Sequence, residues 1–501
     1  MNQLDELKNA VPKTPESFHR MVEETVKEQT GSQARTILFP KQKKHSIGNM
    51  KRIAAIVIAA VLLIPTAVFA GIRFSQRPAA EPEGSYGTKV SFEVSGQNDT
   101  NESAANVYTM PDPFPAAEGF MDYIPEGMSL STKDGYHLYD DADPEHRAFA
   151  FFSIAFDTGS VEDALLIRNV AESRIIQVGE RQAVYLRLMD SLTGNPWNQR
   201  IYLLFPEEYR VLELIFTDGV SLEEAIQVAG GVRFELSSNE FIPREKLWTW
   251  SDMIEDNAGK IEVYTLQETS FPSNADIQVF QIGESYEANL MGYNQENGEL
   301  EYENVSVRLD SIELFDDLSP LDPAYIPDDF DDAAGEDGKL SDAELSYVLM
   351  GDGVDTVDTV VATETKAQKL LYATVTFTNI GEDTLHQMGF FGSLPALKDK
   401  DGVYSTCVRT SPTSGPYSYI LHSNIPDTYR NGYEEMRYCD VRSEFGDGGN
   451  NLTLAPGESK TVHLAWIVDE DLLPDLYLSL DPTGFLRQTS DHTAYLFDIQ
   501  P

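Results

Sequence analysis

Cysteine is scarce in this 501-residue sequence, and motifs that place histidine or cysteine for catalysis are missing. The two cysteines are not spaced as Cys-x-x-Cys, and the eight histidines include no His-Glu-x-x-His helix. Zinc and other transition-metal catalysis therefore have no basis in the sequence. Gly-x-Ser-x-Gly, Ser-x-x-Lys and the phosphate-cradling Gly-Lys-Ser/Thr loop are also missing. Carboxylates are too numerous for spacing to single out an acid–base pair, so we predict that the protein is not an enzyme.

Positive charge is scarce beyond residue 52. Residues 1–52 carry 10 Lys and Arg against 6 Asp and Glu, whereas the rest of the chain carries 27 against 76. A surface this acidic repels nucleic acid and anionic lipid, so we expect no nucleic-acid partner for the large acidic part.

Long hydrophobic runs are limited to one, with 20 uncharged residues at 53–72. This length spans a bilayer core, and we predict a transmembrane helix over 51–74. Basic residues crowd the N-terminal side of the run, so the positive-inside rule predicts a cell-membrane protein with a cytoplasmic N-terminus and an extracellular C-terminus. The alternative is a signal cleaved after Ala70, although more than 50 residues would then precede its apolar core. The basic membrane flank comprises Lys43, Lys44, Lys51 and Arg52.

The segment 1–50 is predicted to be helical and cytoplasmic. Thr14 is a suitable N-cap with Pro15 at the first helical position, and an apolar stripe follows at helical spacing. So short a segment cannot bury this stripe by itself, so we expect a protein partner or the inner leaflet to cover it. The alternative is a loosely ordered tail whose charges only set the orientation. The candidate partner-binding residues are Phe18, Met21, Val22 and Val26.

Residues 75–112 are rich in Pro, Gly, Asn and Ser and are predicted to be a linker. An exported α+β domain, an antiparallel sheet plus a helix, is expected over 113–237. Its strands are predicted at 148–156, with hairpins at 173–190 and 198–216. Ser221 and Glu224 form a capping-box pattern ahead of an apolar helical face. The sequence of this domain contains no pattern typical of a catalytic or metal-binding site.

A connector is predicted over 238–260, and an all-β sandwich over 261–501. In the connector, Trp248 and Trp250 are either a surface pair for a sugar or wall polymer, or the filling of a seam between domains. Short strands separated by turn residues favour the sandwich, with the clearest strand beginning at Leu370.

An acidic insertion occupies 313–358, with 15 Asp and Glu and one Lys. Part of it resembles an EF-hand loop in which Asp337, Ser341 and Glu344 supply ligands around the turn glycine Gly338. Two carboxylate positions of that motif are missing, so any Ca²⁺ site would be weak and no other cofactor is expected. The alternative is a solvated acidic loop that leads into a short helix over 341–350.

Cys407 and Cys439 both follow the apolar run. If that part of the chain is exported, they can form one disulfide; the alternative is two separate thiols.

The layout as a whole resembles the anti-sigma-factor-like single-pass membrane proteins of Gram-positive bacteria. The resemblance rests on the helical segment LKNAVPKTPESFHRMVEETVKEQ, the basic flank and single span, and the motifs YIPEGM and SLEEAIQVAGGV of an uncharacterised exported module. The C-terminal half resembles immunoglobulin-like β-sandwich modules of bacterial surface proteins. The zinc-type anti-sigma signature is missing, since residues 1–52 contain no cysteine.

The resemblance implies that the inner segment binds an extracytoplasmic-function sigma factor and that the exported domains sense or bind an unidentified envelope ligand. The alternative is a surface-displayed binding or structural protein of the cell envelope without a regulatory role.

Overall fold

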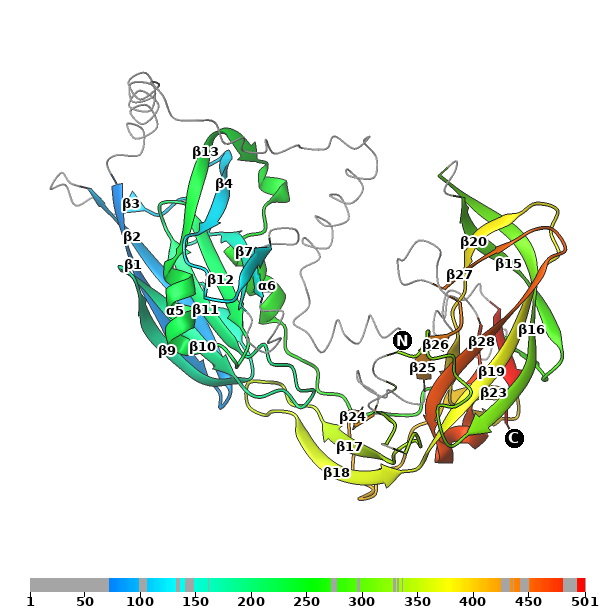
Figure 1. Ribbon diagram of the computed structural model, residues 1–501. Helices are drawn as coiled ribbons and strands as arrows, with labels where there is room; N and C mark the ends of the chain where they lie inside the picture. The colour runs from blue at the N-terminus through cyan, green and yellow to red at the C-terminus, as the bar shows by residue number, and fades with distance from the viewer. Residues whose placement is uncertain are drawn as a thin grey trace. The chain divides into compact units, whose positions relative to one another are not determined.

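In the computed structural model the chain is built mostly of β-strands arranged in several sheets (Figure 1). The described residues fall into two compact units. The N-terminal unit contains residues 72–262 together with 351–357, and the C-terminal unit contains 263–350 and 358–500. The structure describes residues 72–98, 106–131, 136–139, 148–160, 162–271, 277–294, 298–327, 330, 333–335, 337–424, 433–435, 437–441, 450–480 and 493–500.

A seven-stranded antiparallel sheet is the middle layer of the N-terminal unit. The hairpins predicted at 173–190 and 198–216 are confirmed as the antiparallel pairs β9–β10 and β11–β12, in which runs rich in apolar residues are joined by short turns. Both faces of the sheet are buried under other elements. In spatial order the strands are β5 (Ser129–Ser131), β6 (Tyr136–Tyr139), β7 (Ala148–Ala155), β12 (Arg210–Phe216), β11 (Gln199–Phe205), β10 (Arg181–Leu188) and β9 (Val170–Val178).

One face of this sheet is covered by a second, smaller sheet and by helix α6 (Trp250–Ala258). Trp250 is completely buried and packs against the rings of Phe92, Phe156 and Tyr202. A capping box between Thr249 and Asp252 starts the helix. The covering sheet contains β1 (Ile72–Glu83), β2 (Gly87–Asn98), β3 (Asn106–Val107) and β8 (Leu165–Ile167).

The other face is covered by helix α5 (Leu222–Gly230) and by the pair β4 (Phe114–Met121) and β13 (Val232–Ile242). The Ser221 hydroxyl accepts a hydrogen bond from the Glu224 backbone N–H, so the predicted helix start is confirmed. Ala225 and Ala229 from the predicted apolar face are buried against the sheet. A short 3₁₀ helix, η1 (Arg244–Lys246), leads from β13 towards α6.

The first two strands correct the predicted boundaries. β1 and β2 pair along their whole length, where a linker was predicted over 75–112, and β1 includes the last three residues of the helix predicted over 51–74. The prolines that suggested a linker, Pro78 and Pro82, are tolerated because β1 lies at the edge of its sheet and, among the described strands, pairs with β2 alone. The predicted connector 238–260 is likewise part of the N-terminal unit, since Trp250 belongs to its core. This burial also excludes Trp250 from a surface aromatic pair.

The rest of the predicted membrane helix, through Gly71, lies outside the described residues, as do the basic flank and the segment 1–50. Among the residues that are described, no helix is long and apolar enough to cross a membrane.

The loop 351–357 belongs to the N-terminal unit although it lies far along the chain. The backbone N–H groups of Ser85 and Tyr86 donate to the Val354 carbonyl at 2.8 and 2.7 Å. The Asn169 N–H donates to the Gly353 carbonyl at 2.8 Å. Three N–H groups of the loop itself donate to Asp352 Oδ1, at 2.8–3.0 Å, and these bonds lower the pKa of Asp352 to about 2.

We expect Asp352→Asn to loosen this loop. The pKa of Asp352 is below its unfolded value of about 3.9, so its stabilising effect is present above that value and is lost as the pH falls towards about 2. Native-state hydrogen exchange should show faster exchange at the amides of Val354, Asp355 and Thr356 in the variant at pH 6. Unchanged exchange there would contradict the assigned role. Asp355→Asn, which leaves the accepting carboxylate in place, is the matched control.

A five-stranded antiparallel sheet organises the C-terminal unit. The strand predicted from Leu370 is confirmed within β19, and alternate residues of it, such as Ala373 and Val375, enter the core. The core lies between this sheet and several smaller sheets, because one hydrophobic cluster draws residues from both. In spatial order the strands are β15 (Ser285–Asn294), β16 (Glu299–Phe315), β19 (Gln368–Asn379), β28 (Ser459–Asp469) and β26 (Tyr438–Cys439).

The smaller sheets of this unit are two- and three-stranded. A three-stranded sheet of β18 (Thr359–Lys366), β17 (Ala343–Leu349) and β24 (Tyr419–His422) has its own small core around Tyr347 and Tyr417. A 3₁₀ helix, η2 (Glu470–Asp475), follows β28. The remaining strands are β14 (Ile277–Phe280), β20 (Leu385–Gly389), β21 (Ser393–Pro395), β22 (Leu397–Lys400), β23 (Val403–Thr406), β25 (Tyr433–Glu435), β27 (Asn451–Leu454), β29 (Tyr477–Leu478) and β30 (Ala494–Asp498).

The acidic insertion is more than a solvated loop. Its apolar residues Leu321 and Phe330 are buried against Leu370, Ala465 and Ile467 on the outward side of the five-stranded sheet. The helix predicted over 341–350 is wrong, because β17 forms there. The burial pattern of β17 alternates through its first residues, and this period of two is typical of a strand.

Candidate functional site: a buried polar network

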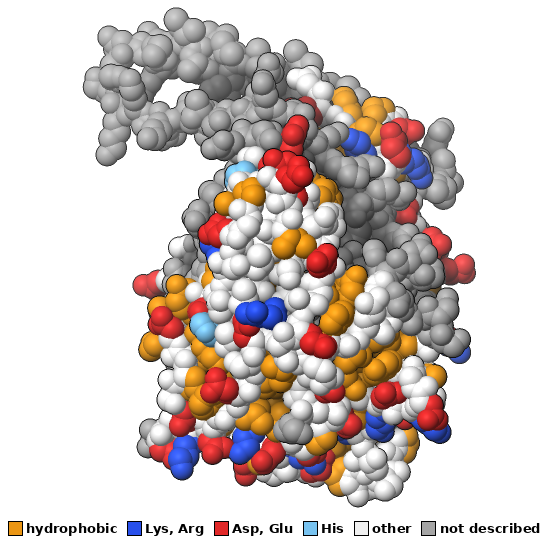
Figure 2. Space-filling model, turned by 90° about the vertical axis from the view of Figure 1, so that its right-hand side faces the viewer, with side chains coloured by type: hydrophobic (Ala, Val, Ile, Leu, Met, Phe, Trp, Pro, Cys, Tyr) orange, Lys and Arg blue, Asp and Glu red, His pale blue; other side chains and the backbone are white. Residues whose placement is uncertain are grey.

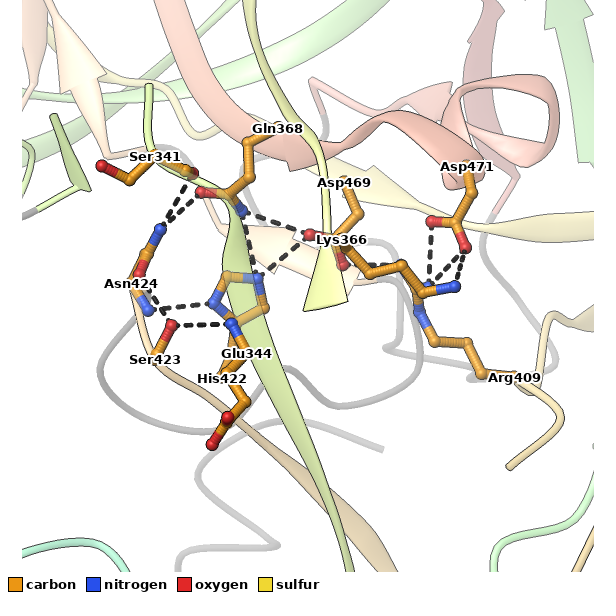
Figure 3. Close-up of polar contacts among 10 residues, drawn as sticks. All are labelled: Ser341, Glu344, Lys366, Gln368, Arg409, His422, Ser423, Asn424, Asp469 and Asp471. Atoms are coloured by element: carbon orange, nitrogen blue, oxygen red, sulfur yellow. Dashed lines mark hydrogen bonds and ion pairs between the residues drawn. The ribbon is translucent and has the colours of Figure 1, made fainter. Parts of the chain in front are cut away.

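A network of buried polar groups lies where the three-stranded sheet meets the end of the five-stranded sheet (Figure 3). We call it the Asp469 network. Strands β17, β18 and β24 contribute residues from one sheet, and β19 and β28 from the other. Its members are Ser341, Glu344, Lys366, Gln368, Arg409, His422, Ser423, Asn424, Asp469 and Asp471.

Asp469 is at the centre of the network and is completely buried. Its Oδ2 accepts from Arg409 Nη2 at 2.6 Å, and its Oδ1 accepts from Gln368 Nε2 at 3.2 Å. Burial by itself would raise the pKa of Asp469, but the hydrogen bond from His422 and the Arg409 charge outweigh it and lower the pKa. Asp469 is therefore held ionised.

His422 is buried and has both ring nitrogens in use. The Asn424 backbone N–H approaches Nδ1 at 3.2 Å, so Nδ1 is the acceptor and Nε2 carries the proton in the neutral ring. Nε2 lies 3.1 Å from Asp469 Oδ1 and donates to it. With no exposed side-chain surface and no nitrogen left over, this histidine cannot act as a general base for an external substrate.

A chain of ion pairs leads from Asp469 towards the surface. Arg409 Nη1 is 2.8 Å from Oδ2 of Asp471, which also pairs with Lys366 Nζ at 2.8 Å. Burial would lower the pKa of Lys366, but the hydrogen bonds with Asp471 and Glu364 raise it. Glu364 also accepts from the Tyr347 hydroxyl. Charges of opposite sign thus alternate outward from the buried carboxylate.

On the other side the network reaches the start of β17. Asn424 Nδ2 donates to Gln368 Oε1 at 3.0 Å and to the Ser341 carbonyl at 3.2 Å. The Glu344 backbone N–H donates to Ser423 Oγ at 2.9 Å. The network therefore fastens the two sheets together around the buried side chains of Gln368, His422 and Asp469. Its outer members Ser341, Glu344, Ser423 and Asp471 are exposed.

The residues predicted to bind calcium do not lie on an EF-hand. Gly338 has a positive φ of 77° in a tight turn, where its N–H donates to the Gly335 carbonyl. Glu344 lies in β17 and not on an exiting helix, so the EF-hand geometry is wrong. Asp337 accepts from the Lys339 N–H at 3.2 Å. In the part of the chain that the structure describes, no group of three His, Cys, Asp or Glu is placed to hold a metal ion.

Of the two alternatives for Cys407 and Cys439, the structure has two separate thiols, both buried in the core of the C-terminal unit. Burial raises the pKa of Cys407 to about 11 and that of Cys439 to about 12. Cys407 also donates to Asp475 Oδ2 at 3.4 Å. Both thiols therefore stay protonated and behave as small core residues.

The candidate partner-binding residues Phe18, Met21, Val22 and Val26 lie outside the described residues, and so do Lys43, Lys44, Lys51 and Arg52. Sequence reasoning did not identify Arg409, His422 or Asp469. They come from distant segments, and no spacing rule connects them.

No protein-family model matches the chain, and no curated protein does either. Function has to be argued from the residues themselves.

Proposed function

We propose that the protein is a single-pass membrane protein of the anti-sigma-factor-like type, with a cytoplasmic N-terminal helix that binds a partner and extracellular β-rich units that sense or bind an envelope ligand. The observation that carries the proposal is the charge split across the apolar run. Residues before it have an excess of Lys and Arg, and residues after it hold 76 Asp and Glu against 27 Lys and Arg. The first described strand, β1, begins at Ile72, the last residue of that run.

The C-terminal unit supports a binding role rather than an enzymatic one. Its layered sheets are consistent with the proposed immunoglobulin-like sandwich, a scaffold that commonly presents a surface to partners. An apolar hollow beside Ile312 and Ile499 has a volume of about 120 Å³, whereas small-molecule sites usually have at least about 300 Å³. That hollow is therefore too small for a typical small-molecule ligand.

The proposal predicts that residues 1–52 recover a sigma factor from a lysate of the source organism. Phe18→Asp with Val22→Asp should abolish recovery, because charge is placed on the apolar stripe that meets the partner. In the full chain the same pair should change transcription from the sigma factor's promoters. Arg20→Asp with Lys27→Asp places carboxylates away from the stripe and is the control. Recovery of no sigma factor, together with unchanged transcription, would exclude the regulatory role.

A second candidate is a surface-displayed binding protein whose inner tail has no regulatory role. The absence of cysteine from residues 1–52 favours it, because the zinc-type anti-sigma signature is then missing. Protease accessibility in intact cells separates both candidates from a cleaved, secreted form. In each of them the acidic part is digested from outside while residues 1–50 are protected. Weak Ca²⁺ binding stays a prediction for either candidate.

A further inference from the structure

The tip of the β15–β16 hairpin carries an exposed apolar patch. Met291 pairs with Tyr302 across the two strands, and Tyr293 pairs with Leu300. Their exposed fractions are 49, 56, 42 and 57 %, respectively, and the Tyr302 hydroxyl lies 3.5 Å from the Met291 sulfur. Four large apolar side chains in two adjacent cross-strand pairs form one continuous surface. We call these four residues the hairpin patch.

The opposite side of the hairpin tip is braced by β20, and Figure 1 shows β15, β16 and β20 side by side. At Gly292 a Cβ atom would lie 2.2 Å from the His386 carbonyl oxygen, so the backbones approach too closely for any other residue. Glu301 Oε2 accepts from the His386 N–H at 3.2 Å and lies 2.8 Å from His386 Nδ1. Asn294 Nδ2 donates to Glu301 Oε1 at 2.7 Å. The patch is thus held on a rigid support and loses little entropy on binding.

The same hairpin is strongly anionic. Residues 284–304 contain six Glu and neither Lys nor Arg. Glu287 is exposed on β15, on the same side of the sheet as Met291 and Tyr293, and Glu299 is exposed at the tip. Figure 2, which faces the C-terminal unit, shows acidic side chains beside hydrophobic ones on this surface. The excess of carboxylates on this hairpin favours a cation through Coulomb attraction, and the exposed tyrosine rings favour one through cation–π contact.

Two other exposed apolar side chains of this unit are isolated by comparison. Val403 and Val360 are 44 and 40 % exposed and lie on separate strands of different sheets. Scattered residues of this kind are normal on a soluble surface, whereas adjacent pairs on a braced hairpin form a contiguous binding surface.

We propose that the hairpin patch is a docking surface for a basic polypeptide segment, in which apolar side chains contact Met291, Tyr293, Leu300 and Tyr302 while Lys or Arg side chains meet carboxylates of the same hairpin such as Glu287 and Glu299. The proposal rests on the proposed function in taking this unit as the ligand-binding part, and it names the class of ligand. A neutral glycan could stack on the tyrosine rings but would not be attracted by the carboxylates. The dependence of binding on charge therefore distinguishes a basic polypeptide from a neutral glycan.

The test uses the full chain in nanodiscs of zwitterionic lipid, with empty nanodiscs as background. The probe is a fluorescent peptide in which Lys alternates with Leu and Tyr, read by anisotropy. We expect saturable binding that weakens about fivefold when salt is raised from about 50 to about 300 mM, because screening reduces the charge attraction. Tyr302→Ser and Leu300→Ser should each weaken binding about tenfold, as removal of a central apolar anchor does. Glu287→Lys should weaken it through charge alone.

The matched control is Val403→Ser, which removes an equally exposed apolar side chain from the same unit and should bind as the wild type does. Circular dichroism checks that every variant is folded. The proposal is overturned if the wild type does not bind the peptide, if folded Tyr302→Ser binds it unchanged, or if a peptide with Glu in place of Lys binds equally well. Competition by a neutral chitin oligosaccharide would assign the patch to a glycan instead. The assay contains no sigma factor, so its failure is separate from failure of the regulatory role.

Discussion

Asp469→Asn is expected to destabilise the C-terminal unit by about 3 kcal/mol. The substitution keeps the shape of the side chain but removes the charge that faces Arg409, whose own side chain is only 7 % exposed. Arg409 would keep its ion pair with the partly exposed Asp471 but would lose its fully buried carboxylate partner, which destabilises a buried guanidinium. Hydrogen exchange of the β19 and β28 amides in the full chain measures the loss for this unit separately from the other.

The matched control for this substitution is Glu458→Gln, since the pair of Glu458 with Lys460 is exposed and should change stability by less than about 0.5 kcal/mol. The effect of Asp469 should also depend on pH. The pKa of Asp469 is lowered in the folded state, so its contribution is complete above the unfolded value of about 3.9 and declines as the pH falls below it. Equal losses for Asp469→Asn and Glu458→Gln would contradict a stabilising network.

Trp250→Ala should destabilise the N-terminal unit by about 4 kcal/mol. The indole is completely buried among Phe92, Phe156 and Tyr202, and its Nε1 donates to the Asp163 carbonyl at 3.3 Å. Truncation to Ala leaves a large cavity and removes the hydrogen bond to the Asp163 carbonyl. Hydrogen exchange of the β2 and β10 amides measures this loss of stability.

Trp197→Ala provides the control. Trp197 is only partly buried, so this substitution should lower the free energy of unfolding by about 1 kcal/mol or less. If Trp250→Ala proved no more damaging than Trp197→Ala, helix α6 would not be part of the core of this unit.

Local pattern was enough to predict several elements. In the hairpins β9–β10 and β11–β12, strands rich in apolar residues flank short turns, so neighbouring residues contain the information required. The start of α5 is equally local, because the Ser221 side chain satisfies an N–H only three residues away.

Pairing with distant strands explains the elements that local sequence patterns predicted wrongly. Pro78 and Pro82 indicated a linker, yet an edge strand tolerates them because their side of β1 needs no second partner. Ser341 and Asp342 are typical of a helix start, but pairing of β17 with both β18 and β24 outweighs that preference.

The Asp469 network lay beyond sequence reasoning for a different reason. Asp469 and Arg409 are 60 residues apart, and each resembles the many other charged residues of an acidic chain. The hairpin patch did leave a signal: Met291, Tyr293, Leu300 and Tyr302 are apolar on the side of β15 and β16 opposite to the core-facing Leu290 and Val305. Strands apolar on both sides indicate a second contact surface.

The contribution of residues 351–357 to the N-terminal unit has a practical meaning for dissecting the protein. A fragment that ends at Glu262 would lack the carbonyl acceptors for the N–H groups of Ser85, Tyr86 and Asn169, although it contains every strand and helix of that unit. The boundary at Glu262 is therefore not a clean place to divide the gene. An intact unit would need the missing loop supplied as a peptide, or grafted onto the fragment by a new connection.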